Sequence, residues 1–361
     1  MKTVLNTKSK SDPSIESIDK YKPLVTVVVP AYNEAAIIEK NLSVLCKYME
    51  SIESDYRWEI IVVNDGSTDE TGELAEAFAK KASNIRVLHH RYNMRLGQAL
   101  RTAFDNYKGD YVVTMDLDLS YSPDHIGIML TKMREMDADI VLASPYMKGG
   151  KVSNVPWLRK KLSIWANRFL SFASKESVST LTSMVRAYNA KFLSQLDLRA
   201  MHVDIHSEII YKASILRARI VEIPAHLDWG FLKESGKQRI SSMRIMKGIT
   251  WNLLTGFMFR PFIFFILPGF IILLLSLYPI VWVFIHTFTH YSQLTALSGS
   301  LANKLSYSIA KAFSQAPHAF IVGGFAFVIA IQLISLGIVA LQNHRYYKDL
   351  FHIISTHKHH D

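Results

Sequence analysis

Two aspartates separated by a single residue, Asp116 and Asp118, have the type and spacing that metal chemistry requires. They follow an apolar run, Tyr111–Met115, which is predicted to be a β-strand. On extended chain, residues i and i+2 project to the same side, so the two carboxylates are expected to lie close together. Such a pair repels unless a cation neutralises it, and hard oxygen ligands suit Mg²⁺ or Mn²⁺. Two solvated turn aspartates are the alternative interpretation.

Two other predicted strands also end in polar turns. The run Leu24–Val29 is followed by PAYNE, and the run Glu59–Val63 is followed by NDGSTDET. A carboxylate at Asp65 could accept hydrogen bonds from a nucleotide base or ribose, or it could simply form a turn. Glu34 has a similar alternative, since an acidic side chain favours the N-terminus of a helix.

The elements that position these turns alternate along the chain. Strands are predicted at 24–29, 59–63, 85–89 and 111–115, with helices at 34–51, 69–82 and 98–106 between them. This rhythm predicts a doubly wound, mostly parallel α/β sheet, in which ligands bind beyond the carboxyl ends of the strands. The sequence contains neither a Rossmann glycine fingerprint nor a P-loop, which argues against a dehydrogenase or a kinase.

Two later stretches, 261–285 and 319–341, are almost free of charge and long enough to cross a bilayer. Buried core helices are the alternative, although these rarely stay uncharged for so long. Basic residues flank the pair on its outer sides, while the connecting segment carries two lysines, Lys304 and Lys311. The positive-inside rule therefore predicts that the α/β region and both termini are cytoplasmic.

The formal net charge of +10 suits an anionic membrane surface and phosphate-bearing substrates. No nucleic-acid recognition motif accompanies this charge, so nucleic acid is not an expected partner. The single cysteine, Cys46, excludes an internal disulfide and a multi-cysteine metal site, and the scattered histidines lack the spacing of a zinc motif. A homo-oligomer is left open.

The segment 156–172 combines basic residues with Trp165, Phe169 and Phe172 at helical spacing. Such an amphipathic helix is predicted to lie in the membrane interface, with its aromatic side chains at the acyl boundary. An ordinary surface helix packed on the catalytic domain is the alternative.

A series of motifs resembles the family 2 glycosyltransferases, in particular their dolichol-phosphate mannosyltransferase-like, polyisoprenyl-phosphate glycosyltransferase branch. The motifs span residues 24–250, and they are VVVPAYNEAAII, EIIVVNDGSTDETGE, NMRLGQALRTAF, YVVTMDLDLSYSP, SPYMKGGKVSNVPWLRKKLS and IHSEIIYKA. The resemblance implies a GT-A-type fold and transfer of a sugar from a UDP- or GDP-linked donor, dependent on Mg²⁺ or Mn²⁺.

The resemblance also assigns residues. It implies a nucleotide-sugar pocket formed by Pro30, Tyr32, Glu34, Asp65, Gly97 and Asp116. It implies a metal site at Asp116, Asp118 and Ser120, where serine replaces the usual glutamine. It implies an acceptor-phosphate site at Lys148, Arg159, Lys160 and Ser163, and a catalytic set of Asp116, Asp118, Arg159 and Glu208.

The implied acceptor is a dolichyl or undecaprenyl phosphate, and transfer of one sugar inverts the anomeric configuration. An ionised phosphate needs no general base, whereas a hydroxyl acceptor does. Three positions depart from the family pattern: Pro145 replaces an arginine, Thr180 an aspartate and Met184 a glycine. They keep a non-processive transferase acting on a lipid or glycan hydroxyl as one alternative. A catalytically weak membrane scaffold subunit is another.

The expected organisation has seven parts. They are a disordered tail (1–22), a cytoplasmic catalytic domain (23–235), a basic juxtamembrane helix (236–259), a first span (260–286), an extracytoplasmic loop (287–317), a second span (318–342) and a cytoplasmic tail (343–361).

Overall fold

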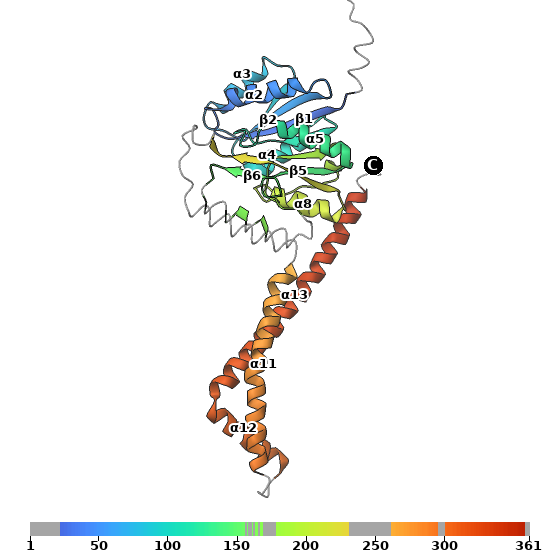
Figure 1. Cartoon of the computed structure of the whole chain (residues 1–361). Coiled ribbons are helices and arrows are strands. Elements are labelled where there is room, and N and C mark those ends of the chain that lie inside the picture. The colour runs from blue at the N-terminus through green and yellow to red at the C-terminus, as the bar shows by residue number, and fades with distance from the viewer. Residues whose placement is uncertain are drawn as a thin grey trace, which may run out of the picture. The chain divides into compact units, whose positions relative to one another are not determined.

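A computed structural model describes most of the chain, drawn in colour in Figure 1. The described residues are 22–155, 157, 161, 163–164, 167–168, 178–230, 261–294 and 300–357. The predicted tail up to residue 21 and the predicted helix at 236–259 lie outside them. The chain forms two compact units, one of Met1–Thr255 with Ile354–Asp361 and the other of Gly256–Ile353.

The first unit is built on a seven-stranded sheet of order β3-β2-β1-β4-β7-β5-β8. Its strands are β1 (Leu24–Ala31), β2 (Arg57–Asn64), β3 (Ile85–His89), β4 (Tyr111–Thr114), β5 (Ile140–Ser144), β7 (Arg186–Asn189) and β8 (Ile220–Pro224). All neighbouring strands pair in parallel except β7, which runs antiparallel to both β4 and β5. The expected doubly wound, mostly parallel sheet is confirmed.

Helices cover both faces of this sheet, as Figure 1 shows with α2 and α3 on one side and α8 on the other. The helices are α2 (Ile38–Ser51), α3 (Thr71–Ala79), α4 (Arg95–Phe104), α5 (Asp124–Met136), α7 (Ala190–Leu193) and α8 (Ile205–Ile215). Residues 25–29 of β1 are completely or almost completely buried on both sides. This explains why the strand reads as a continuous apolar run, because alternation is lost when both faces are covered.

Helix α2 starts four residues later than predicted. Asn33 adopts a left-handed backbone (φ 55°), and the carbonyl of Glu34 accepts hydrogen bonds from the amides of Ile37 and Ile38 at 3.0 and 3.1 Å. The PAYNE segment is therefore a structured loop, and the amides of Asn33 and Glu34 donate to side chains of the loop after β2.

A second sheet of two parallel strands, β6 (Lys151–Ser153) and β9 (His226–Asp228), lies beyond β4 in the chain. The amide of Asp228 donates to the carbonyl of Ser120 at 2.9 Å, and Tyr121 forms a bridge with Leu227. These contacts fix the segment that carries the Asp-x-Asp pair.

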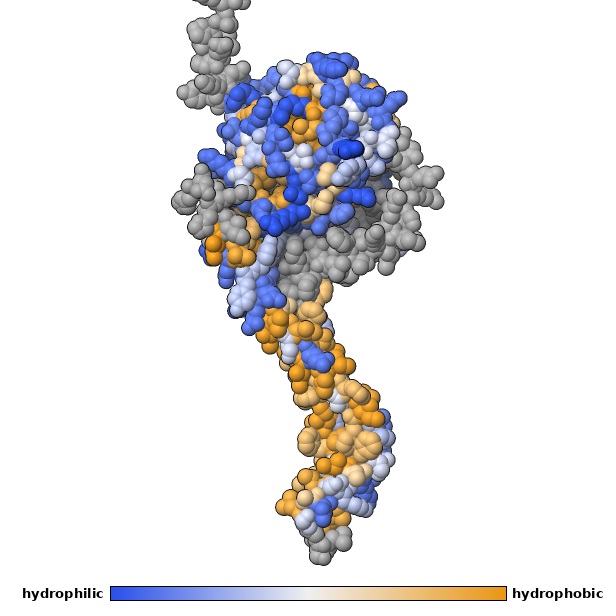
Figure 2. Space-filling model, turned by 180° about the vertical axis from the view of Figure 1, so that it is seen from behind, coloured by the Kyte–Doolittle hydropathy of each residue, from blue (hydrophilic) through white to orange (hydrophobic). Residues whose placement is uncertain are grey.

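The described residues of the second unit belong almost entirely to three helices, α11 (Pro261–Gln293), α12 (Leu301–Gln315) and α13 (Pro317–His357), the last of which continues beyond Ile353. Phe264–Gln293 and Pro317–Phe351 are long and apolar enough to span a membrane, and only 11% of the most apolar window of each is buried. Figure 2 shows the apolar surface over this unit. A soluble protein would bury such surface, so the protein is membrane-associated. Helix α12 lies within the segment 287–317, which was predicted to connect the two spans.

Glycines allow α11 and α13 to approach closely. A Cβ atom added to Gly269 would lie 3.0 Å from the side chain of Ile334 and 3.2 Å from the carbonyl oxygen of Ala330. At Gly323 it would lie 3.0 Å from the ring of Pro279. Small residues at such contacts are typical of helices that pack in lipid, where van der Waals contact replaces the hydrophobic effect.

Candidate active site

The site lies at the point where the strand order reverses, between the carboxyl ends of β1 and β4. From β1 the chain proceeds outward through β2 and β3, and it then returns to place β4 on the other side of β1. The amide of Met115 donates to the carbonyl of Val28 at 3.0 Å, so the two strand ends are directly adjacent. Ligands of open α/β sheets bind at this reversal point. The structure therefore brings the predicted residues Pro30, Tyr32 and Asp116 to one edge.

The loops after β1 and β2 are joined by hydrogen bonds. The amide of Asn33 donates to Ser67 Oγ at 3.0 Å, and the amide of Thr68 donates to Asn33 Oδ1 at 2.8 Å. The amide of Glu34 donates to Thr71 Oγ1 at 2.8 Å. We call the segments 30–35, 64–71 and 90–97 together the nucleotide wall, because they contain Pro30, Tyr32, Glu34, Asp65 and Gly97, which the motif resemblance assigns to the nucleotide-sugar pocket.

Asp65 connects the third segment of this wall to the other two. The residue is only 4% exposed. Its Oδ1 atom accepts hydrogen bonds from the amide of Met94 at 2.8 Å and from His90 Nδ1 at 2.7 Å. His90 Nε2 in turn lies 2.8 Å from Thr102 Oγ1. Both contacts of Asp65 use Oδ1, so Oδ2 keeps its capacity to accept a hydrogen bond from a ligand. The sequence did not indicate a role for His90, because its partner is distant in the chain.

Two glycines allow the wall to pack closely. Gly66 has φ +65°, and a Cβ atom on it would lie 2.2 Å from the carbonyl carbon of Tyr92. A Cβ atom on Gly97 would lie 2.5 Å from the carbonyl oxygen of Ala200. Both positions therefore require glycine, for backbone conformation and space at Gly66 and for space at Gly97.

The Asp-x-Asp pair follows β4 on a tight turn. Leu119 is left-handed (φ 49°), and Asp118 Oδ1 accepts a hydrogen bond from the amide of Ser120 at 2.9 Å. Burial, followed by the negative charge of Asp118, raises the pKa of Asp116 from its ordinary 3.8 to about 7. A carboxylate that is this costly to ionise fits a site for a hard divalent cation. The cation would offset both the loss of hydration on burial and the repulsion from Asp118. Among the described residues, no group of three or more His, Cys, Asp or Glu side chains forms a metal site, so water and substrate oxygens would complete the coordination.

The predicted acceptor residues are only partly described. Arg159 and Lys160 lie outside the described residues, while Lys148 is exposed in the turn after β5. Ser163 Oγ accepts a hydrogen bond from the hydroxyl of Tyr146 at 2.7 Å. In the segment 156–172, the described positions 157, 161, 163, 164, 167 and 168 are helical, and Lys161 Nζ lies 5.2 Å from the centroid of the exposed Trp157 ring.

One position that departs from the family pattern, Thr180, lies beside Ser144 at the end of β5, the residue before Pro145. Ser144 Oγ contacts the hydroxyls of both Ser179 and Thr180, and the amides of these last two residues donate to the carboxylate of Glu222 at 2.8–3.0 Å. Thr180 is therefore a buried, hydrogen-bonded hydroxyl where the family pattern has a carboxylate.

Glu208 lies on α8, and its carboxylate oxygens accept hydrogen bonds from the amides of Arg199 and Ala200. Lys212 Nζ forms an ion pair with Glu208 Oε1 at 2.7 Å. The predicted catalytic carboxylate is therefore engaged in holding a loop.

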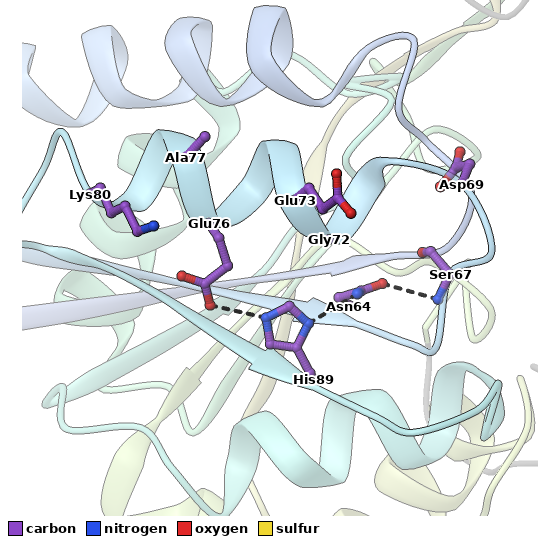
Figure 3. A pocket seen from close by; sticks show the side chains of 9 residues that line it. All are labelled: Asn64, Ser67, Asp69, Gly72, Glu73, Glu76, Ala77, Lys80 and His89. Carbon is purple, nitrogen blue, oxygen red and sulfur yellow. Dashed lines mark hydrogen bonds and ion pairs between the residues drawn. The ribbon is translucent and has the colours of Figure 1, made fainter.

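A cavity of about 490 Å³ opens between α3 and β3, next to the loop after β2 (Figure 3). Asn64 Oδ1 accepts a hydrogen bond from the amide of Ser67, which leaves Asn64 Nδ2 to donate to His89 Nδ1 at 3.0 Å. The Nε2 atom of His89 then carries the proton that binds Glu76 Oε1 at 3.0 Å. The cavity is lined in part by Asn64, Ser67 and Asp69 of the wall and contains neither aspartate of the pair.

Comparison with known proteins identifies the family. A family model described as "Glycosyl transferase family 2" matches residues 26–197. The polyprenol monophosphomannose synthase of Mycolicibacterium smegmatis is 32% identical over 237 residues, which cover 63% of this chain and 86% of that protein. The dolichol-phosphate mannosyltransferase of Pyrococcus furiosus is 29% identical over 203 residues, which cover 55% of each chain.

Among solved structures, the glucosyl-3-phosphoglycerate synthase of Mycobacterium tuberculosis, in complex with Mn²⁺ and uridine diphosphate, superimposes with a TM-score of 0.46 and 19% identity. The superposition covers 70% of this chain and 86% of that one. The sheet of order 3-2-1-4, the polar strand ends and the sequence similarity lead to one conclusion. This chain belongs to glycosyltransferase family 2 and has a GT-A-type fold.

Proposed function

We propose that this glycosyltransferase moves a single sugar from a nucleotide-sugar donor to a polyisoprenyl phosphate at the cytoplasmic face of the membrane, with inversion at the anomeric carbon. The observation that carries the proposal is the Asp116–Asp118 pair at the sheet's reversal point, next to a nucleotide wall built from three loops. The names of the similar proteins, which refer to polyprenol and dolichol phosphate, support the choice of acceptor.

On the donor side, the nucleotide wall would bind the base and ribose. Asp65 offers Oδ2 as an acceptor, and the exposed ring of Tyr32 is available to contact the nucleotide. Asp116 and Asp118 would hold Mg²⁺ or Mn²⁺, with the Ser120 hydroxyl nearby. The bound cation would stabilise the negative charge that develops on the leaving nucleoside diphosphate.

On the acceptor side, a phosphate oxygen would attack the anomeric carbon from the face opposite the leaving group, which inverts the configuration. Arg159, Lys160, Lys148 and Ser163 would bind the phosphate, and a guanidinium group is well suited to this because it binds two phosphate oxygens at once. The phosphate is already ionised at neutral pH, so no side chain needs to take its proton.

Among the described residues at the positions that depart from the family pattern, we find no free carboxylate that would serve a hydroxyl acceptor. That reaction needs a carboxylate to remove a proton. At the positions that depart from the family pattern, the hydroxyl of Thr180 is hydrogen-bonded to that of Ser144. The Glu222 carboxylate already accepts hydrogen bonds from two backbone amides. The basic residues on the outer sides of the two apolar helices support a cytoplasmic catalytic unit.

The test uses the full chain in detergent or liposomes, with Mn²⁺ and radiolabelled UDP- or GDP-sugars. We expect label to enter a polyprenyl phosphate, and we expect Asp118→Asn to remove most of this activity. Asp105→Asn, an exposed aspartate away from the pair, is the matched control and should retain it. Transfer to free polyprenol or glycan hydroxyls instead of the phosphate would contradict the proposal, as would full activity of Asp118→Asn.

A further inference from the structure

Glu208 is engaged on both of its carboxylate oxygens. The amide of Arg199 lies 3.1 Å from each oxygen, and the amide of Ala200 lies 2.8 Å from Oε2. Lys212, whose side chain is 4% exposed, pairs with Oε1 at 2.7 Å and also donates to the carbonyl of Asp197. A carboxylate that accepts two backbone amides and an ammonium group is strongly held in place. It is poorly suited to accept a proton from a substrate, since its lone pairs are already in use.

The loop that Glu208 holds lies directly against the N-terminus of α4. The amide of Gln98 donates to the carbonyl of Met201 at 3.3 Å. The α-carbon of Gly97 approaches the loop so closely that a Cβ atom would be 2.5 Å from both the Ala200 oxygen and the Met201 carbonyl carbon. The contact is between two backbones, so a displacement of the loop would be transmitted to the first turn of α4.

The first turn of α4 continues into the nucleotide wall. Arg95 has a left-handed backbone (φ 75°), and the amide of Met94 donates to Asp65 Oδ1 at 2.8 Å. The Asp65 carboxylate thus depends on the position of residues 94–97 for one of its two hydrogen bonds. From Glu208 to Asp65 the contacts are continuous, and each step uses backbone atoms with a defined position.

We infer that Glu208 is a positioning residue for the donor nucleotide: it holds the loop 197–202, which holds the α4 N-terminus, which orients Asp65. The inference rests on the proposed function in one respect, namely that the nucleotide binds at the wall. Glu208 then acts on donor affinity and does not touch the reacting atoms.

The test measures binding of UDP and GDP to the full chain with Mn²⁺ and without any acceptor, so it does not depend on the acceptor's identity. For Glu208→Gln we expect nucleotide affinity to fall on the order of ten-fold, which corresponds to the loss of one or two hydrogen bonds. The KM for the donor sugar should rise in parallel, while kcat at saturating donor stays within about two-fold. The matched control is Glu135→Gln. It removes the exposed ion pair of Glu135 with Lys132 on α5 and should leave nucleotide affinity unchanged.

Hydrogen exchange on the wild-type protein provides a second measurement that needs no variant. Nucleotide binding should slow exchange at the amides of Arg199 and Ala200, although the inference places neither in contact with the nucleotide. The inference would be overturned if Glu208→Gln lowered kcat at unchanged nucleotide affinity. It would also be overturned if nucleotide binding left the exchange rate of these two amides unchanged. If the wild type binds neither nucleotide, the proposed function fails instead.

Discussion

Asp116 should make the protein less stable when it is ionised and no cation is present. Its pKa in the folded chain is raised from 3.8 to about 7, so the folded state binds the proton more tightly than the unfolded state. The contribution of Asp116 to stability is therefore largest below pH 4, declines as the pH rises towards 7 and stays low above it. The full shift of about three pKa units corresponds to about 4 kcal/mol at about 1.4 kcal/mol per unit. Because the residue is partly exposed, we expect about 1–3 kcal/mol after screening by solvent.

Replacement by asparagine removes this charge without changing the size of the side chain. We expect Asp116→Asn to unfold at a higher temperature than the wild type at pH 8 in EDTA, by several degrees for a domain of this size. At pH 5 the two proteins should differ much less, because the wild-type carboxyl is then mostly protonated. Adding Mn²⁺ at pH 8 should raise the melting temperature of the wild type and have little effect on the variant, since metal ligands must be deprotonated.

The measurement is thermal unfolding of the full chain in one detergent across pH 5–8, with Asp105→Asn as an exposed control. Equal or lower melting temperatures for Asp116→Asn at pH 8 in EDTA would refute the reasoning. So would a stabilisation that is the same at pH 5 and pH 8, because the effect would then not come from ionisation.

Three further changes test other parts of the structure. Gly66→Ala should abolish nucleotide binding, because its Cβ would lie 2.2 Å from backbone of the neighbouring loop; calorimetry with UDP and GDP measures this. His90→Ala removes one of the two hydrogen bonds of Asp65 and should weaken nucleotide binding about ten-fold, and unchanged affinity would show that the contact is dispensable. Gly269→Leu should lower the melting temperature of the helical unit in detergent, whereas Gly324→Ala, where a Cβ meets no atom within 4 Å, should not.

The fold could be predicted from the sequence because its early strands are continuous apolar runs ending in polar turns. The predicted strand at 85–89 matches β3, and those at 24–29 and 59–63 lie within β1 and β2. The antiparallel β7 could not be predicted, since Arg186–Asn189 contains a fully buried arginine whose guanidinium donates to backbone carbonyls, a pattern that does not resemble a core strand. Helix α12 was missed because its small and polar residues resemble a loop.

The site could be predicted only in part, for a similar reason. Asp65 and Asp116 stand directly at strand ends, so a rule about parallel sheets locates them. The link from His90 to Asp65 joins residues 25 positions apart through side chains, and the amides that bind Glu208 are eight and nine positions away. Neither leaves a short motif in the sequence. For Glu208 the motif resemblance suggested catalysis, while the hydrogen bonds favour a structural role.

Two of the three substitutions that set this chain apart from the family pattern, Pro145 and Thr180, are best understood together. Pro145 stands where an arginine is usual and Thr180 where an aspartate is usual, and Ser144, next to the first, contacts Thr180 through their hydroxyl groups. Both positions are buried, so a single remaining charge there would lack a partner and would be costly. Removing both charges avoids that cost, and the Glu222 carboxylate still fixes the backbone of the loop through the amides of Ser179 and Thr180. The concerted loss is therefore compatible with a folded loop at this end of β5.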